Sequence, residues 1–143
     1  MSRLMKIAVI LLLAVTLTGC FQASLVMTIT PNPITYEYGK EAPDITFKLR
    51  TQGFGVLQLN RLILELLDED GASANRTEIN LGTSAVVVPG VGRTEIQPLN
   101  LPFNPSELSE EDYIAQYKGK TYTLKVTITG GKDVTAEAQV VFE

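Results

Sequence analysis

Two alternating runs near the end of the chain constrain its fold most strongly. Residues 121–129 alternate between polar and apolar side chains, and residues 133–140 do so again. A period of two predicts a pair of β-strands, each with one buried and one solvated face. A slip of one residue would turn every side chain to the opposite face, so the apolar faces match only when Ile128 lies opposite Val134. The connection is then a three-residue turn at 130–132, a common hairpin length, and its glycines can supply positive φ.

The same register makes a prediction for the outer face of this hairpin. It places Lys125 directly opposite Glu137, where the two side chains can form an exposed ion pair.

Earlier runs show the same alternation and are separated by turn signals roughly every ten residues, which predicts an all-β sandwich. They cover residues 25–30, 34–38, 45–50, 59–67, 79–88 and 96–103. In the last run, a shift of register at Pro98 would put Ile96 on the same face as Leu99 and Leu101. Pro31 and Pro33 should break the first strand, because proline cannot donate to a ladder. Residues 59–67 could also form a short amphipathic helix. The turn expected at 68–71 favours a central strand instead.

Residues 104–117 depart from the strand pattern and carry two helix-start signals. Asn104 can cap a helix that begins at Pro105, a residue favoured at the first helical position. Ser109 repeats the cap and is followed by an acidic first turn, which suits the helix dipole. That turn contains Glu110, Glu111 and Asp112. We expect one or two short helical turns that cross the end of the sandwich.

The composition excludes several kinds of active site. The 143 residues include no histidine, no tryptophan and a single cysteine, Cys20. Nucleophile–base pairs of the Ser-His or Cys-His type and metal sites of imidazole or thiolate therefore cannot be built. The carboxylates at 68–70 fit a solvated turn, because a calcium loop needs further oxygen ligands and a closing glutamate. We expect no enzyme activity, no cofactor and no metal.

The N-terminal segment has the order of an export signal. Arg3 and Lys6 precede an apolar run that is shorter than the roughly 20 residues needed to span a bilayer as a helix. The run leads to Leu17, Thr18, Gly19 and Cys20. This stretch resembles a bacterial lipobox. The resemblance implies a signal peptide at residues 1–19, cleavage before Cys20 and lipid attached to that cysteine. Residues 20–24 would then be a tether and residues 25–143 the domain.

Two alternatives remain open for this segment: an uncleaved membrane span, and an ordinary cleaved signal with an incidental cysteine. A lone exported thiol has no disulfide partner, which favours the lipid role. Cleavage before Cys20 would remove residues 1–19, including Arg3 and Lys6. It would leave 124 residues with 10 basic and 16 acidic side chains, a net charge of −6. That charge disfavours a nucleic-acid partner. Phe21 stands where inner-membrane lipoproteins of diderm bacteria usually carry aspartate, which implies the outer membrane in such a host.

The strand order resembles the immunoglobulin-like domains of bacterial envelope proteins over residues 24–143. The resemblance also uses Gly39 before the strand that contains Phe47, and Tyr122 two residues before Leu124. In immunoglobulin domains a corner tyrosine stands two residues before a core position. The family's cysteine pair and core tryptophan are absent. The resemblance implies an antiparallel β-sandwich of about seven strands, with a short helical segment before the last hairpin.

These observations predict a lipid-anchored, non-enzymatic module of the bacterial cell envelope that works as an accessory or scaffold subunit through protein contacts. The alternative is a small-ligand or carbohydrate-binding lipoprotein, which would need a concave aromatic patch with convergent polar groups. Tyr36, Tyr38, Tyr113 and Tyr117 could form a binding surface, but half-buried strand and corner positions are more common for such residues. Glycine-rich turns should gather at the end where the first strand starts, and acidic turns at the other. We expect the first end to face the membrane and the second to meet a protein partner. The candidate partner-binding residues are Glu110, Glu111 and Asp112.

Overall fold

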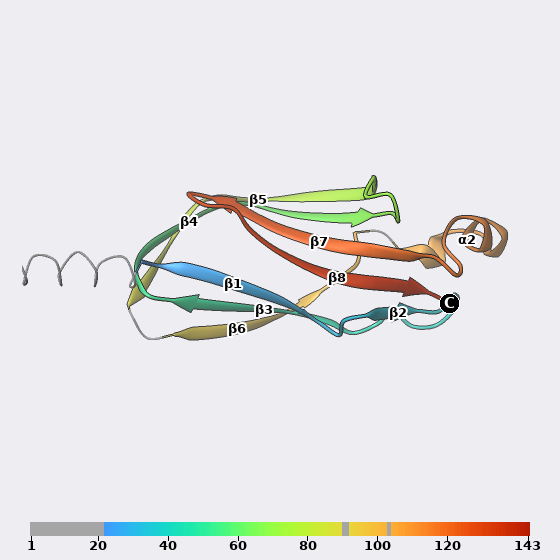
Figure 1. The fold of residues 1–143 in the computed structure, drawn as a ribbon, viewed down its shortest axis with the longest axis horizontal. Coiled ribbons are helices and arrows are strands. Elements are labelled where there is room, and N and C mark those ends of the chain that lie inside the picture. Colours follow the sequence, from blue (N-terminus) through green and yellow to red (C-terminus); the bar gives the residue numbers. More distant parts are fainter. Residues whose placement is uncertain (1–21, 90–91, 103) are drawn as a thin grey trace, which may run out of the picture.

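The computed structural model describes residues 22–89, 92–102 and 104–143. In this part of the chain eight strands form two stacked layers, which confirms an all-β sandwich (Figure 1). The strands are β1 (Ser24–Thr30), β2 (Ile34–Tyr36), β3 (Ile45–Gln52), β4 (Phe54–Leu67), β5 (Ser73–Pro89), β6 (Arg93–Leu99), β7 (Thr121–Gly130) and β8 (Val134–Phe142). A 3-10 helix, η1 (Pro105–Glu107), and an α-helix, α2 (Glu110–Gln116), precede β7 as expected.

The two sheets differ in size, with the order β1-β3-β6 in one and β2-β8-β7-β4-β5 in the other. The chain leaves the first sheet at Pro31 and Pro33, whose preceding peptide bonds are both cis. Proline has no N–H to continue the ladder of β1, so β2 joins the second sheet. There β2 pairs in parallel with β8, whereas the other strand pairs of the described residues are antiparallel. The expectation of about seven antiparallel strands is corrected to eight strands with one parallel pair.

The C-terminal hairpin has the predicted register. Ile128 lies opposite Val134, and Lys125 lies opposite Glu137. The reason given for the turn glycines was wrong, because neither Gly130 nor Gly131 has a positive φ. Gly130 instead lies so close to β4 that an added Cβ would be 1.7 Å from the carbonyl oxygen of Gln58. A close approach of two backbones therefore requires glycine at this position.

Residues 59–67 lie in β4, so the helical alternative is wrong. β4 pairs with β7 on one side and with β5 on the other. The β4–β5 ladder is interrupted at Asn60, which faces residues 81–83 of β5. Gly82 has a φ of 69° there, and its N–H donates to Asn80 Oδ1 at 2.8 Å. Bulges bend and twist a ribbon, and the first half of β4 crosses from the level of one sheet to the other (Figure 1).

The core is tightly packed near β2 and α2 and looser near the start of β1. Tyr36, Leu66, Leu124 and Phe142 at the packed end are at most 1% exposed. The inward-pointing leucines near the start of β1 are only partly buried. These are Leu25, Leu49, Leu57 and Leu59.

β6 lacks the shift of register predicted at Pro98, because its pairing with β3 is regular from Arg93 to Leu99. Pairing with β3 places Glu95 beside Leu49 and Leu99 beside Ile45, so the charged positions of β6 face between the sheets. Ile96, predicted among the apolar positions of this strand, lies on the outer face and is 64% exposed. The strand also ends at Leu99, earlier than expected. Residue 103, predicted to belong to it, lies outside the described residues.

Candidate functional site

The strand directions give the sandwich two chemically different ends. At the N-terminal end, the start of β1 lies beside the end of β3, since Ser24 pairs with Gln52. The start of β4 is also there, because Gln22 bridges Phe54. The turn at 130–132 completes this end, as Gly130 pairs with Leu59. The predicted grouping of glycine-rich turns is therefore confirmed for the loops at 52–56 and 130–132. The third predicted turn, at 89–92, includes residues 90 and 91, which lie outside the described residues.

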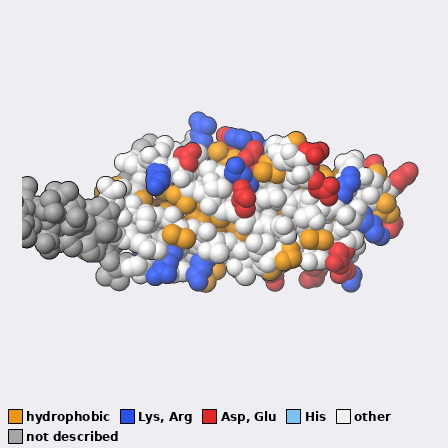
Figure 2. All heavy atoms as spheres, viewed as in Figure 1, with side chains coloured by type: hydrophobic (Ala, Val, Ile, Leu, Met, Phe, Trp, Pro, Cys, Tyr) orange, Lys and Arg blue, Asp and Glu red, His pale blue; other side chains and the backbone are white. Residues whose placement is uncertain are grey.

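The acidic end lies opposite and comprises the turns at 37–44 and 68–71 together with η1 and α2. Acidic side chains are more frequent toward this right-hand end, around α2, in Figure 2. Asp68 is used within its own turn, where Oδ1 accepts from the N–H groups of Asp70 and Ala72 at 3.0 and 2.8 Å. This geometry supports the interpretation of residues 68–70 as a turn rather than as a cation loop.

The three candidate partner-binding residues lie together in the first turn of α2, and all are exposed. Asp112 has a structural task there. Its N–H donates to Ser109 Oγ at 3.1 Å, and Ser109 Oγ donates to Asp112 Oδ2 at 2.7 Å. This is the predicted N-cap, which stabilises the helix by about 1 kcal/mol. Glu110 and Glu111 are thus better candidates for a partner contact than Asp112.

Tyrosine hydroxyls fix the helical segment to the sandwich, which the sequence did not predict. Tyr113 OH donates to the Glu143 carbonyl at 2.8 Å, and Tyr122 OH donates to the Gln116 carbonyl at 2.9 Å. Tyr38 OH reaches the Leu108 carbonyl at 2.9 Å, and Tyr36 OH shares a hydrogen bond of 2.6 Å with Ser106 Oγ. Burial raises the pKa values of the phenols of Tyr113, Tyr117 and Tyr122.

The tyrosines therefore form a structural cluster with Phe142. This agrees with the preferred interpretation of strand and corner aromatics, and the alternative of a tyrosine binding surface is wrong. Only the margin of the cluster meets solvent. There Tyr38 and Glu110 line a surface depression with Ile114, which is 50% exposed, and Lys118. Ile114 is thus an exposed aliphatic side chain on a helix whose first turn is acidic.

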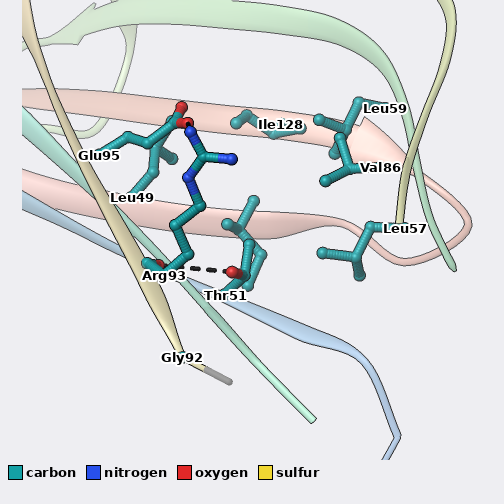
Figure 3. Close-up of a pocket in the computed structure, with 10 residues that line it drawn as sticks. Leu49, Thr51, Leu57, Leu59, Val86, Gly92, Arg93, Glu95 and Ile128 are labelled. Carbon is teal, nitrogen blue, oxygen red and sulfur yellow. Dashed lines mark hydrogen bonds and ion pairs between the residues drawn. The ribbon is translucent and has the colours of Figure 1, made fainter. Parts of the chain in front are cut away.

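A cavity of about 430 Å³ lies between the sheets at the N-terminal end. Leu25, Leu49 and Thr51 line it from the three-stranded sheet. Leu57, Leu59, Val86 and Ile128 line it from the five-stranded sheet, and the remaining lining residues are Gly92, Arg93 and Glu95. Figure 3 shows the Arg93 side chain beside this aliphatic group, with its guanidinium next to Glu95. The ten lining residues include no aromatic ring.

The cavity exists because β6 cannot close the sandwich over apolar side chains. Its inward positions before the buried Leu99 are Arg93, Glu95 and Gln97, which remain exposed. Arg93 Nη2 lies 3.3 Å from Glu95 Oε1, and Thr51 Oγ1 donates to the Arg93 carbonyl at 3.4 Å. A charged strand face stays hydrated, so the leucines opposite it keep part of their surface accessible.

A second cavity of about 520 Å³ adjoins the first at the beginning of the described chain. It is lined by Gln22, Ala23 and Ser24 and by residues of β4 and the 130–132 turn. The two cavities share Leu25, Leu57, Leu59 and Ile128. The second cavity has a more polar lining than the first, with Gln22, Ser24, Gln58 and Lys132 among its residues.

The lipobox residues Leu17, Thr18, Gly19 and Cys20 lie outside the described residues. In the described ranges, no helix is long and apolar enough to cross a membrane. The same ranges contain no group of three or more acidic, histidine or cysteine side chains placed to hold a metal ion.

Comparison with known proteins identifies no family. No protein-family description matches the chain, and no curated protein sequence does. A CARDB domain from Pyrococcus furiosus, solved in complex with di-metal ions, shares 11% identity over 86% of this chain and 91% of its own, with a TM-score of 0.45. The Pseudomonas fluorescens alkylpurine DNA glycosylase AlkC, solved bound to DNA containing an abasic site analogue, shares 12% identity over 85% of this chain and 31% of its own, with a TM-score of 0.46. Similarity at these scores carries no conclusion about what this chain binds or does.

Proposed function

We propose that this chain is a lipid-anchored, non-enzymatic module of the bacterial cell envelope, in the outer membrane where the host has one. It would serve as an accessory or scaffold subunit that binds another envelope protein and no nucleic acid. The carrying observation is that β1 begins at the end of the sandwich opposite α2 (Figure 1). A lipid on Cys20 would leave four residues before Leu25, which reach about 13–14 Å when extended. The N-terminal end would then face the bilayer, and the acidic end would remain available to a partner.

The strand arrangement supports an immunoglobulin-like topology for this module. The N-terminal run is divided between the two sheets, because β1 belongs to the three-stranded sheet and β2 to the five-stranded sheet. Tyr122 OH donates to the carbonyl of Gln116 six residues upstream, as a corner tyrosine of immunoglobulin domains bonds back to the preceding backbone.

The anchor is tested by Cys20→Ala in a bacterial host fed a labelled fatty acid. We expect the parent chain to carry the label and to migrate as the processed form. The variant should carry no label and should remain a precursor, because the modified atom is the thiol. A variant that is processed and partitions into detergent like the parent would contradict the anchor.

The partner surface is tested by replacing Glu110 and Glu111 with glutamine while Asp112 keeps its cap. Cross-linked membranes should then yield less of any stoichiometric partner, because the exposed charges of α2 are gone. The matched control is Asp133→Asn with Glu137→Gln, which removes two exposed carboxylates outside the acidic end. If the partner is still captured after replacement of Glu110 and Glu111 but is lost in Phe54→Ser, the partner binds at the N-terminal end and the proposed surface is wrong.

Small-ligand binding is a second candidate function, and the cavity between the sheets favours it. Its volume falls within the range of about 300–1,000 Å³ found for ligand sites. The carbohydrate form of this candidate is less favoured, since the lining has no aromatic ring on which a sugar could stack.

A further inference from the structure

We infer that the cavity at the N-terminal end binds one aliphatic chain with an anionic head group, either a fatty acid or the acyl chain of a lipid. The inference specifies the second candidate function and depends on neither the anchor nor the partner surface.

The wall of the cavity selects for a flexible hydrocarbon. Six of its ten lining side chains are aliphatic, namely Leu25, Leu49, Leu57, Leu59, Val86 and Ile128. Five of them are only partly buried or exposed, so apolar surface remains accessible to water when the cavity is empty. A bound hydrocarbon would remove that surface from water. The wall offers few hydrogen-bonding groups, so a polyol would lose its hydration without replacement.

The two adjoining cavities offer more wall to a long ligand than to a compact one. The second cavity continues the first through Leu25, Leu57, Leu59 and Ile128 and reaches Gln22. An extended chain can occupy both parts, whereas a small rounded ligand would fill only one of them.

The edge of the cavity provides a cation for the head group. The Arg93 side chain is 78% exposed, and its one ion pair within the described residues joins Nη2 to Glu95. A guanidinium has five N–H donors, so most of them remain available to a carboxylate or phosphate. Glu95 repels an anionic head group, and its removal should therefore strengthen binding. An exposed pair of this kind is weak enough for a ligand to rearrange.

The test uses the full chain in phosphatidylcholine vesicles with palmitate that carries a diazirine near its methyl end. After illumination, mass spectrometry locates the labelled peptides. We expect label on peptides that contain Leu57, Leu59, Val86 or Ile128, with excess unlabelled palmitate as competitor. A parallel sample contains phosphatidylcholine with the same diazirine chain and no free fatty acid. Label from the free acid alone identifies a fatty-acid site, and label from both identifies a site for lipid acyl chains.

Two pairs of variants make the result specific. Val86→Phe fills the cavity and should lower labelling about tenfold, equivalent to about 1.4 kcal/mol. Val26→Phe, on the outer face of β1, should leave it unchanged. Arg93→Gln should weaken competition by palmitate but not by hexadecanol, whereas Arg50→Gln on the outer face of β3 should alter neither. Glu95→Gln should strengthen competition by palmitate.

The same labelling by diazirine palmitate is also measured on protein that does not associate with vesicles. A failed anchor would then abolish vesicle association but not labelling, whereas an empty cavity would abolish labelling. Label spread evenly over the molecule, or equal labelling of the Val86→Phe and Val26→Phe variants, would overturn the inference. Because Arg93 is exposed, its replacement should not impair folding, and an unchanged preference for palmitate in that variant would overturn the role of the head group.

Discussion

Gly130 is a residue at which two backbones meet. It ends β7 at the point where that strand pairs with Leu59 of β4. Its backbone has no positive φ, so conformational freedom does not explain the glycine. The reason is the space beside it, where a Cβ would lie 1.7 Å from Gln58 O.

Gly130→Ala should therefore destabilise the protein. We expect the free energy of unfolding to fall by about 1–3 kcal/mol, the usual cost of forcing extra atoms into a packed site. Gly131→Ala is the matched control, because its nearest contact would be 3.9 Å away. It should change stability by about 0.5 kcal/mol or less. Urea denaturation measures both, and equal losses would contradict the steric explanation.

At the scale of the elements, tertiary contacts hold α2 in place. The helix has seven residues, too few to be stable alone in water. The hydroxyl of its Tyr113 donates a hydrogen bond to the main-chain oxygen of Glu143. Burial raises the pKa of Tyr113, and the nearby Tyr36, Glu143 and Glu37 raise it further.

This raised pKa predicts alkaline sensitivity. In the unfolded chain Tyr113 titrates near its ordinary value of about 10. The unfolded chain thus releases its proton first, so stability is complete below about pH 10 and falls above it. Tyr113→Phe should cost about 0.5–1.5 kcal/mol at neutral pH through the lost hydrogen bond. The fall above pH 10 should be smaller in the variant, and urea denaturation across this range would show it. An equally steep fall in both proteins would contradict the assignment.

How far each element could be predicted depends on whether its signal is local. The caps at Asn104 and Ser109 involve residues two or three apart, so the sequence was sufficient. The hairpin register was also predictable, because two adjacent alternating runs leave one match of their apolar faces. The inward face of β6 was not predictable, because alternation does not say which set of positions points inward. Pairing with β3 turns Glu95 toward the space between the sheets and Ile96 toward the outer face of the sandwich.

The candidate site shows the same division. The sequence correctly placed Glu110, Glu111 and Asp112 at a helix start opposite the beginning of β1. It missed the cavity, whose lining comes from six strands spread along the chain. It favoured structural positions for the tyrosines but missed their hydrogen bonds, which join residues 30 to 70 positions apart.

For the whole molecule, the separation of its two ends is the central structural fact. β7 alone has ten residues and spans about 33 Å. That length is several times the Debye length of roughly 8 Å at physiological salt. Acidic side chains at the far end would therefore escape repulsion by an anionic membrane surface. The N-terminal end instead presents Phe54 and Val56, which are 57% and 55% exposed.

The most direct test of this orientation measures the distance of each end from the bilayer. Spin labels are attached to Phe54→Cys and, separately, to Ile114→Cys in the full chain bound to vesicles that contain lipid with a chelated paramagnetic ion. Both positions are at least half exposed, so labelling should not disturb the fold. We predict strong relaxation of the label at position 54 and little at position 114. Stronger relaxation at position 114, or equal relaxation at both, would contradict an anchor at the N-terminal end.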